Sequence, residues 1–224
     1  MSTARRSAPR TTTPSPEAGV AATAPRVTKR GLERRDRILE VAAEMFLAHG
    51  YDGVSIDDIV KVVGGSKTNV YSHFGGKEGL FAAVVEEMCG DFLDGLQGME
   101  ATDPDPAAGL RAIGRALVAV LLEARHVAFQ RLVIAESGRF PAMARAWFEA
   151  GPQRARAVIA RCIAFHQQAG RLRPADPARM ATRFHDMIVT NGLYQALLGT
   201  PPAAQEREAA IDEAVATLLH GHAA

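Results

Sequence analysis

The segment that most constrains the fold of this chain is residues 55–81, which reads SIDDIVKVVGGSKTNVYSHFGGKEGLF. Two short helical patterns in it are separated by Gly64-Gly65, and a third pattern begins after Gly75-Gly76. Glycine tolerates the left-handed backbone conformation in which many helices end. Two short helices about a tight glycine-containing turn form a helix-turn-helix, so the segment predicts that motif.

Each of these two helices has its own start signal and its own apolar anchors. Ser55, with Asp58 three residues on, is a capping-box start, and Ser66 is suited to cap the second helix. In the second helix Val70 and Phe74 share one face, which we expect to point into the core. The apolar face of the first helix consists of Ile56, Ile59, Val60 and Val63.

The face of the second helix opposite its two anchors is polar. It carries Thr68, Asn69 and Ser72, with Lys67, Tyr71 and His73 beside them. The helix is roughly 13 Å long, which is comparable with the width of a DNA major groove, about 12 Å. Such a face predicts hydrogen bonds to base edges. The plainer interpretation is a helical hairpin of an all-α core whose polar residues are merely solvated.

The segment resembles the DNA-binding domain of the TetR family of bacterial transcriptional regulators in Ser55…Ile59…Gly64-x-Ser66…Val70-Tyr71-x-His73-Phe74-x-x-Lys77-Glu78-x-Leu80. The resemblance covers about Arg34 to Val85. Gly65 stands where the family usually has valine or another apolar residue, and Thr68-Asn69 replaces the common Gly-Thr. The second departure lies among the base-reading positions, so an operator sequence cannot be transferred from relatives.

The resemblance implies a double-stranded, pseudo-palindromic DNA operator as partner. It implies base contacts by Lys67, Thr68, Asn69 and Ser72. It implies phosphate contacts by Ser55, Tyr71, His73 and Lys77. The helix that begins at Lys77 adds free amide groups and the positive end of its dipole toward a phosphate.

Composition limits the class of protein. The formal net charge of the 224 residues is only +1, so a nucleic-acid surface has to arise from local placement of charge. No apolar run approaches the roughly 20 residues of a membrane span, and the start of the chain lacks a hydrophobic signal segment. Cys89 and Cys162 lie far apart in the sequence, which argues against a disulfide framework. We therefore expect a cytoplasmic protein with no membrane partner.

The sequence divides into three parts. Residues 1–30 are rich in Ala, Thr, Pro and Ser and carry six basic residues against one acid, which predicts a disordered tail whose last residues can touch DNA. Residues 31–80 are expected to form a three-helix DNA-binding head, and residues 81–224 a larger helical domain. The expected fold is all-α with about nine to ten helices. Within the second domain, Gly151-Pro152 predicts a helix break.

Residues 131–170 resemble the C-terminal domain of the AefR-like branch of the same family, which implies a domain for ligand binding and dimerisation. Its last two helices are expected to pair with those of a second subunit as a four-helix bundle. Each candidate pocket residue, taken singly, is also explained by ordinary core packing. The pocket candidates are His126, Phe129, Met143, Trp147, Phe148, Cys162, His166, Phe184, Met187 and Asn191. The dimer candidates are Phe184, Ile188, Tyr194, Leu198, Ile211, Val215, Leu218 and Leu219.

No residue pattern predicts catalysis, a metal site or a cofactor. Lys67-Thr68 after two glycines fails the P-loop pattern, the histidines form no HExxH motif, and no serine lies in Gly-x-Ser-x-Gly. We expect a homodimeric, non-enzymatic transcription factor, and specifically a repressor that an apolar small molecule releases from DNA. The alternative is a helical small-molecule-binding or sensor protein without a DNA role.

Overall fold

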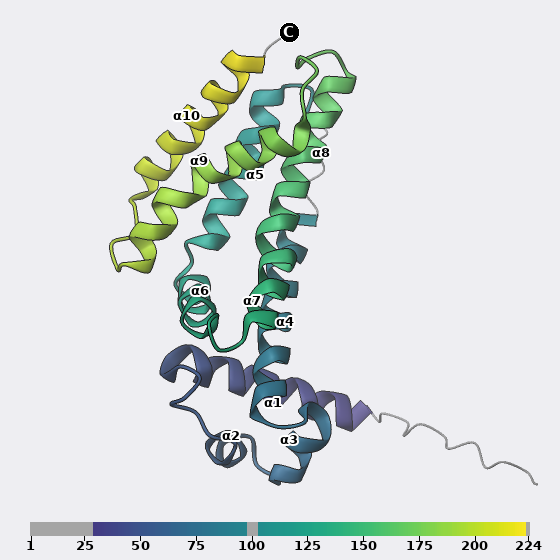
Figure 1. Cartoon of the computed structure of the whole chain (residues 1–224), viewed down its shortest axis with the longest axis vertical. Coiled ribbons are helices and arrows are strands. Elements are labelled where there is room, and N and C mark those ends of the chain that lie inside the picture. The colour runs from purple at the N-terminus through teal and green to yellow at the C-terminus, as the bar shows by residue number, and fades with distance from the viewer. Residues whose placement is uncertain (1–28, 98–102, 223–224) are drawn as a thin grey trace, which may run out of the picture.

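The computed structural model describes residues 29–97 and 103–222, and in these ranges the chain is helical without a β-strand. The predicted tail lies almost wholly outside the described residues. The molecule is elongated, with a small head of three helices at one end and a larger helical body above it (Figure 1). The expectation of an all-α fold with a helix-turn-helix head is confirmed.

The head contains three helices: α1 (Lys29–His49), α2 (Ile56–Val63) and α3 (Lys67–Phe74). Helix α1 begins at Lys29, so the last two residues of the tail predicted over residues 1–30 are helical. The three helices pack around a common core that includes Phe46, Ile59 and Val70. This packing fixes α3 against the other two helices and leaves its outer face exposed.

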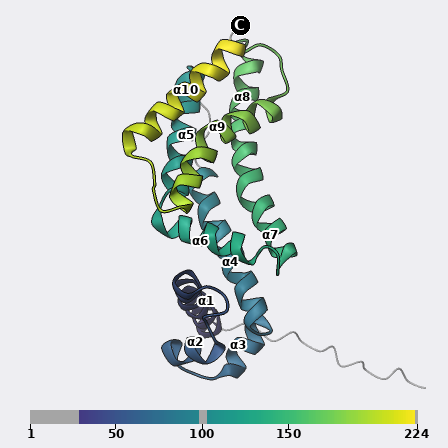
Figure 2. The same cartoon turned by 60° about the vertical axis from the view of Figure 1, so that its left-hand side comes forward.

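Helix α4 (Lys77–Gln97) begins in the head and runs up into the body (Figures 1 and 2). The body is built from α5 (Pro106–Leu121), α6 (Ala124–Glu136), α7 (Pro141–Phe148), η1 (Glu149–Gln153), α8 (Arg154–Gln168), α9 (Pro177–Leu197) and α10 (Ala204–His222). Helices α9 and α10 pack together along one side of the body, as Figure 2 also shows. Asp105 and Asp176 cap α5 and α9 by accepting hydrogen bonds from the first backbone amides, and a proline follows each of them.

The expected helix break at Gly151-Pro152 is wrong. The chain passes through Pro152 in one π-helical turn, η1, and continues directly into α8. Proline lacks the backbone N–H that an α-helix needs, and a wider turn accommodates that loss. Helices α7 and α8 are therefore continuous, with a local irregularity on their inner side at Gly151, which is buried.

Two apolar clusters form the core. One joins α5, α8, α9 and α10, and the other joins the head helices to α4 and α6. Phe129, Leu132 and Val133 of α6 belong to the second cluster, so the core of the head extends into the body. On its other side α6 is tied to α9, because Arg131 donates hydrogen bonds of 2.9 and 2.8 Å to the carbonyl oxygens of Leu197 and Ala196. Helix α6 thus contacts both the DNA-binding head and the C-terminal pair of helices.

Candidate DNA-binding surface and internal cavity

Caps define the start of α2 and the ends of both α2 and α3. The hydroxyl of Ser55 accepts a hydrogen bond from the Asp58 amide (3.2 Å), and the Asp58 carboxylate accepts from the Ser55 amide (3.3 Å), so the predicted capping box is confirmed. Gly64 and Gly75 end α2 and α3 with φ of 76° at each, a backbone conformation that favours glycine. Ser66 occupies the N-cap position of α3, but its side chain makes no capping hydrogen bond.

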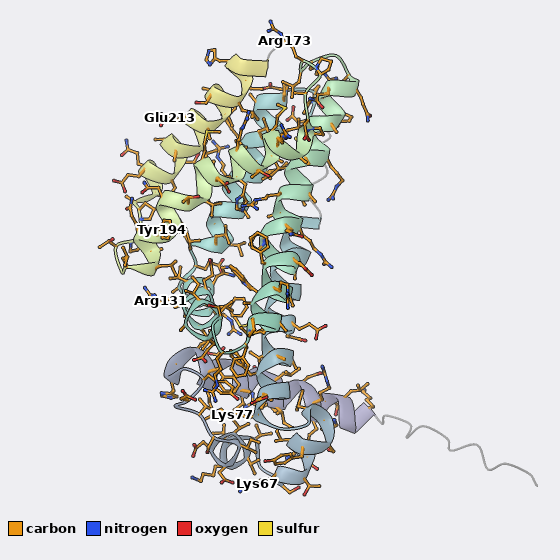
Figure 3. The ribbon with its side chains drawn as sticks, viewed as in Figure 1. Lys67, Lys77, Arg131, Arg173, Tyr194 and Glu213 are labelled. Atoms are coloured by element: carbon orange, nitrogen blue, oxygen red, sulfur yellow. The ribbon has the colours of Figure 1, made fainter. Side chains whose placement is uncertain are left out.

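Helix α3 is anchored by Val70, which is 1% exposed, and its opposite face points away from the head. Asn69 is half-buried, whereas the other predicted DNA-contact residues of this helix are exposed: Lys67, Thr68, Tyr71, Ser72 and His73. Figure 3 places Lys67 at the far end of the head, opposite to the end of the molecule that carries Arg173. The structure therefore brings the predicted base-reading residues together on one accessible helix face.

Two of these residues already have partners within the chain. The Lys67 ammonium lies 2.8 Å from Asp57 Oδ1 on α2, and this contact raises the pKa of Lys67. The Ser72 hydroxyl donates to the carbonyl oxygen of Asn69 at 3.0 Å. A DNA contact by either side chain has to compete with an existing interaction.

The predicted phosphate contact of Ser55 meets a similar obstacle. Its hydroxyl donates to Asp58 Oδ2 at 2.6 Å as part of the capping box. A phosphate oxygen only accepts hydrogen bonds, so Ser55 would have to give up this bond to reach DNA. The structure thus places Ser55 as the cap that orients α2.

Arg34 of α1, which the sequence did not indicate as a functional residue, reaches across the head to the α2–α3 turn. Its guanidinium donates to the carbonyl oxygen of Gly64. Gly65 has a φ of 95°, and a Cβ atom at this position would collide with the Arg34 guanidinium. Gly65, where the family usually has an apolar residue, therefore makes room for the Arg34 guanidinium. Arg34 and Gly64 are 30 positions apart, and no local sequence pattern predicts a contact over that separation.

Lys77, at the first position of α4, lies against an aromatic cluster at the junction of the head with the turn after α6. Its Nζ is 4.1 Å from the centre of the Tyr51 ring, and the Arg139 guanidinium is 4.7 Å from the same centre. Arg139 belongs to the turn after α6 and also pairs with Asp52 at 2.7 Å. Lys77, a predicted phosphate contact, and the α6–α7 turn thus contact the same buried tyrosine.

An internal cavity of about 80 Å³ lies between α4, α5, α6, α7, η1, α8 and α9. Three of the predicted pocket residues line it: His126, Phe129 and Trp147. A more open hollow of about 640 Å³ adjoins it, and this hollow is lined by Met143 and again by Trp147. Cys89 and Trp147 line both spaces, so the cavity and the hollow meet at these two side chains.

The cavity also has polar walls that the sequence analysis did not single out. Gln130 of α6 and His185 of α9 line it, and both are buried. Burial lowers the pKa of His126 to about 4 and lowers that of His185 as well, so both rings are neutral near pH 7. A polar residue on an otherwise apolar helix stripe was the available signal for both positions.

The other pocket candidates lie elsewhere. Cys162, His166 and Phe184 are buried in the body but do not line the cavity. Phe148 is exposed and lies beneath the Arg156 guanidinium. Met187 and Asn191 line a separate groove of about 420 Å³ between α5, α9 and α10.

The dimer candidates separate into two groups. Five are buried in the core of their own chain: Phe184, Ile188, Ile211, Val215 and Leu218. Leu219 is partly buried against that core. Tyr194 is 64% exposed and Leu198 is 83% exposed, and Figure 3 shows Tyr194 at the outer edge of α9. The apolar side chains that α9 and its C-cap leave exposed are therefore Met187, Tyr194 and Leu198.

Two further features of the described residues concern metal sites and membrane-spanning helices. In residues 29–97 and 103–222, no group of three or more His, Cys, Asp and Glu side chains is arranged to hold a metal ion. No helix in the same ranges is both long enough and apolar enough to cross a membrane.

Comparison with known proteins identifies both halves of the chain. Residues 38–84 match the family described as bacterial regulatory proteins, tetR family. Residues 108–224, more than half of the chain, match the C-terminal domain of AefR-like transcriptional repressors.

Solved structures resemble the chain over most of its length. A TetR-family transcriptional regulator from Mesorhizobium loti is 28% identical with a TM-score of 0.82, over 88% of this chain and 100% of that one. The Flavonoid-responsive Regulator FrrA is 27% identical with a TM-score of 0.74, over 85% of this chain and 97% of that one. The HTH-type transcriptional activator FasR of Mycolicibacterium smegmatis is 34% identical over 80 residues, 36% of each chain. The match thus spans about a third of the length of that curated relative.

Proposed function

Because the chain belongs to the TetR family of bacterial regulatory proteins, we propose that it is a homodimeric repressor of transcription that a small molecule releases from its DNA operator. The observation that carries this proposal is helix α3, which is anchored by Val70 and presents a polar face to solvent. The family matched by residues 108–224 is described by its AefR-like repressors, which supports repression rather than activation. The activator FasR shows that a relative can act in the opposite sense.

In this proposal α3 enters the major groove of the operator. The residues that read base edges are Lys67, Thr68, Asn69 and Ser72, while Tyr71, His73 and Lys77 hold phosphates. The amide groups at the start of α4 add to the phosphate contacts, since a helix N-terminus attracts anions. Ser55 serves through its cap, which fixes α2 and thereby the angle of α3.

The dimer is proposed to form through α9 and α10. The exposed Tyr194, Leu198 and Met187 lie beside the groove between these helices, and a partner covering them would bury apolar surface that faces solvent in one chain. A two-fold axis at this face relates two heads, and such dimers read half-sites roughly 34–36 Å apart or multiples of that distance.

The effector is proposed to bind in the cavity between α6 and α9. Helix α6 links this cavity to the head, because it contributes to the cavity wall and to the core around α1. A ligand that fits one arrangement of α6 better than the other shifts the spacing of the two heads. The name of FrrA describes that protein as responsive to flavonoids, which supports a small-molecule effector here. The protein is proposed to act in the cytoplasm, where the operator lies, and to have no catalytic activity.

A gel shift tests the proposal. The full chain is titrated onto a duplex taken from immediately upstream of its own gene and onto a scrambled duplex of the same composition. We expect a discrete complex with the upstream duplex at concentrations at least about tenfold below those needed for the scrambled one. Equal binding to both, or to neither, would favour the alternative of a small-molecule sensor without a DNA role. A reporter gene behind the bound duplex then distinguishes repression from activation.

A further inference from the structure

We propose that the 80 Å³ cavity selects a neutral, largely apolar molecule that carries one hydroxyl or carbonyl group, with the Gln130 amide as its hydrogen-bond donor. This proposal deepens the effector part of the proposed function, because it names the chemical class of the ligand. It rests on two buried polar groups, Gln130 and His185, in the wall of a largely apolar cavity.

The first observation is Gln130 itself. Its side chain is 2% exposed and lines the cavity, and among the described residues no acceptor lies within hydrogen-bonding distance of its Nε2. A buried amide without a partner destabilises the folded state. An acceptor oxygen on a molecule in the cavity would remove that penalty.

The second observation is His185, on the wall formed by α9. Its Nδ1 lies 3.0 Å from Asp186 Oδ1, and a carboxylate only accepts, so Nδ1 carries the proton. In a neutral ring Nε2 is then an acceptor. Asp186 is also held by Arg156 at 2.9 Å, which satisfies its charge outside the cavity. Gln130 and His185 thus offer one donor and one acceptor, the pair of groups that a hydroxyl satisfies.

The cavity contains no fixed charge that would suit an ionic ligand. Among the described residues that line it, none is Asp, Glu, Lys or Arg, and its two histidines are neutral near pH 7 because burial lowers their pKa. An ion would lose its hydration there without gaining a counter-charge. The apolar part of a neutral ligand can extend past Cys89 and Trp147 toward Val85, Met143 and the alanines of the adjoining hollow of about 640 Å³, whose wall also carries Glu86 and Arg154.

Trp147 is the only tryptophan of the chain and borders the cavity, so its fluorescence reports occupancy. Cyclohexanol, cyclohexanone, cyclohexanecarboxylate and cyclohexylammonium differ in one group and do not absorb where tryptophan is excited. We expect a saturable change in emission with the alcohol and the ketone, with dissociation constants at least about tenfold below those of the two ions. Equal binding of an ion, or no saturable response to the alcohol and the ketone, would overturn the proposal.

A variant isolates the role of Gln130. Gln130→Leu should weaken cyclohexanol binding about tenfold, the loss of one hydrogen bond, and should raise the melting temperature of the free protein. The matched control is Gln168→Leu, the same change at an exposed position of α8, which should alter neither quantity. Unchanged cyclohexanol binding in a folded Gln130→Leu protein would contradict the proposal. The comparison of neutral and ionic probes on the unmodified protein stands if this variant does not fold.

The two proposals fail separately. Selective binding of neutral probes without any gel shift would leave the cavity chemistry standing and remove the DNA role. A specific gel shift together with equal binding of neutral and charged probes would do the reverse.

Discussion

The ammonium group of Lys77 lies 4.1 Å from the centre of the Tyr51 ring. Tyr51 is buried, and its ring centre is 4.9 Å from that of Phe140 in the turn after α6. Arg139 of the same turn lies over Tyr51 and pairs with Asp52. Lys77, which is proposed to hold a DNA phosphate, is therefore packed against Tyr51. Tyr51 in turn contacts the turn that follows α6, and α6 lines the cavity.

This relationship predicts that Arg139→Gln weakens DNA binding although Arg139 lies on the body side of the junction. Removing the guanidinium takes away the cation over one part of the Tyr51 ring and the partner of Asp52, so the ring and the Lys77 ammonium on it are held less firmly. We expect affinity to fall about two- to fivefold on cognate and random duplexes alike, as measured by fluorescence anisotropy.

The matched control is Arg125→Gln. Arg125 also starts from α6 and pairs with Glu44 of α1, so the variant removes the same charge across the same junction without touching Tyr51. We expect little change in affinity for this variant. If both variants weaken binding equally, the loss of one positive charge explains the effect, and the contact with Tyr51 does not.

The Asp57–Lys67 ion pair predicts a gain of affinity. Asp57→Asn releases the Lys67 ammonium and removes a negative charge from the DNA-facing side, so binding to random DNA at low salt should tighten about two- to fivefold. The Lys67→Gln background provides the control, because the pair no longer exists there. An equal gain from Asp57→Asn in both backgrounds would show that the ion pair has no part in it.

Local signals made the head predictable. The Ser55–Asp58 capping box and the glycines at 64 and 75 specify where α2 and α3 begin and end, and the structure places these boundaries where the sequence indicated. Such signals act over three or four residues, so they can be read without knowing the fold. The break expected at Pro152 failed because one π-helical turn accommodates the proline, a possibility that the local rule does not include.

Contacts between distant residues were not predictable. Gln130 and His185 meet at one cavity although α6 and α9 are separated by two helices and η1, and Arg34 reaches Gly64 from another helix. The same limit affected the dimer prediction. An apolar stripe shows that a helix face is buried, but it does not distinguish burial within one chain from burial against a partner. Ile211 and Val215 proved to belong to the chain's own core.

The exposed apolar side chains of α9 predict the oligomeric state. Leu198→Glu places a charge at the proposed interface without disturbing the core, since Leu198 is 83% exposed. We expect the dimer to dissociate to a folded monomer in sedimentation-velocity runs. Ile134→Glu, the same kind of change at an exposed site on α6, should leave the dimer intact. A Leu198→Glu protein that remains a dimer would exclude this face.

His126 predicts a pH dependence of stability. Burial lowers its pKa in the folded state to about 4, below the ordinary 6.5, so between these values the unfolded chain binds a proton that the folded chain does not. The free energy of unfolding should therefore fall as the pH drops from 6.5 toward 4. His126→Gln should make this decline shallower, as urea titrations at pH 7, 6 and 5 would measure. Identical slopes for the two proteins would contradict the assignment.

The central claim, that the exposed face of α3 reads DNA sequence, is tested most directly by comparing Asn69→Ala with Lys77→Ala on cognate and scrambled duplexes over a range of salt. The account predicts that Asn69→Ala costs about 1–3 kcal/mol on the cognate duplex and little on the scrambled one. It predicts that Lys77→Ala weakens both duplexes about equally and reduces the salt slope by roughly one ion. If Asn69→Ala weakens both duplexes alike, Asn69 contacts the backbone and the proposed orientation of α3 is wrong.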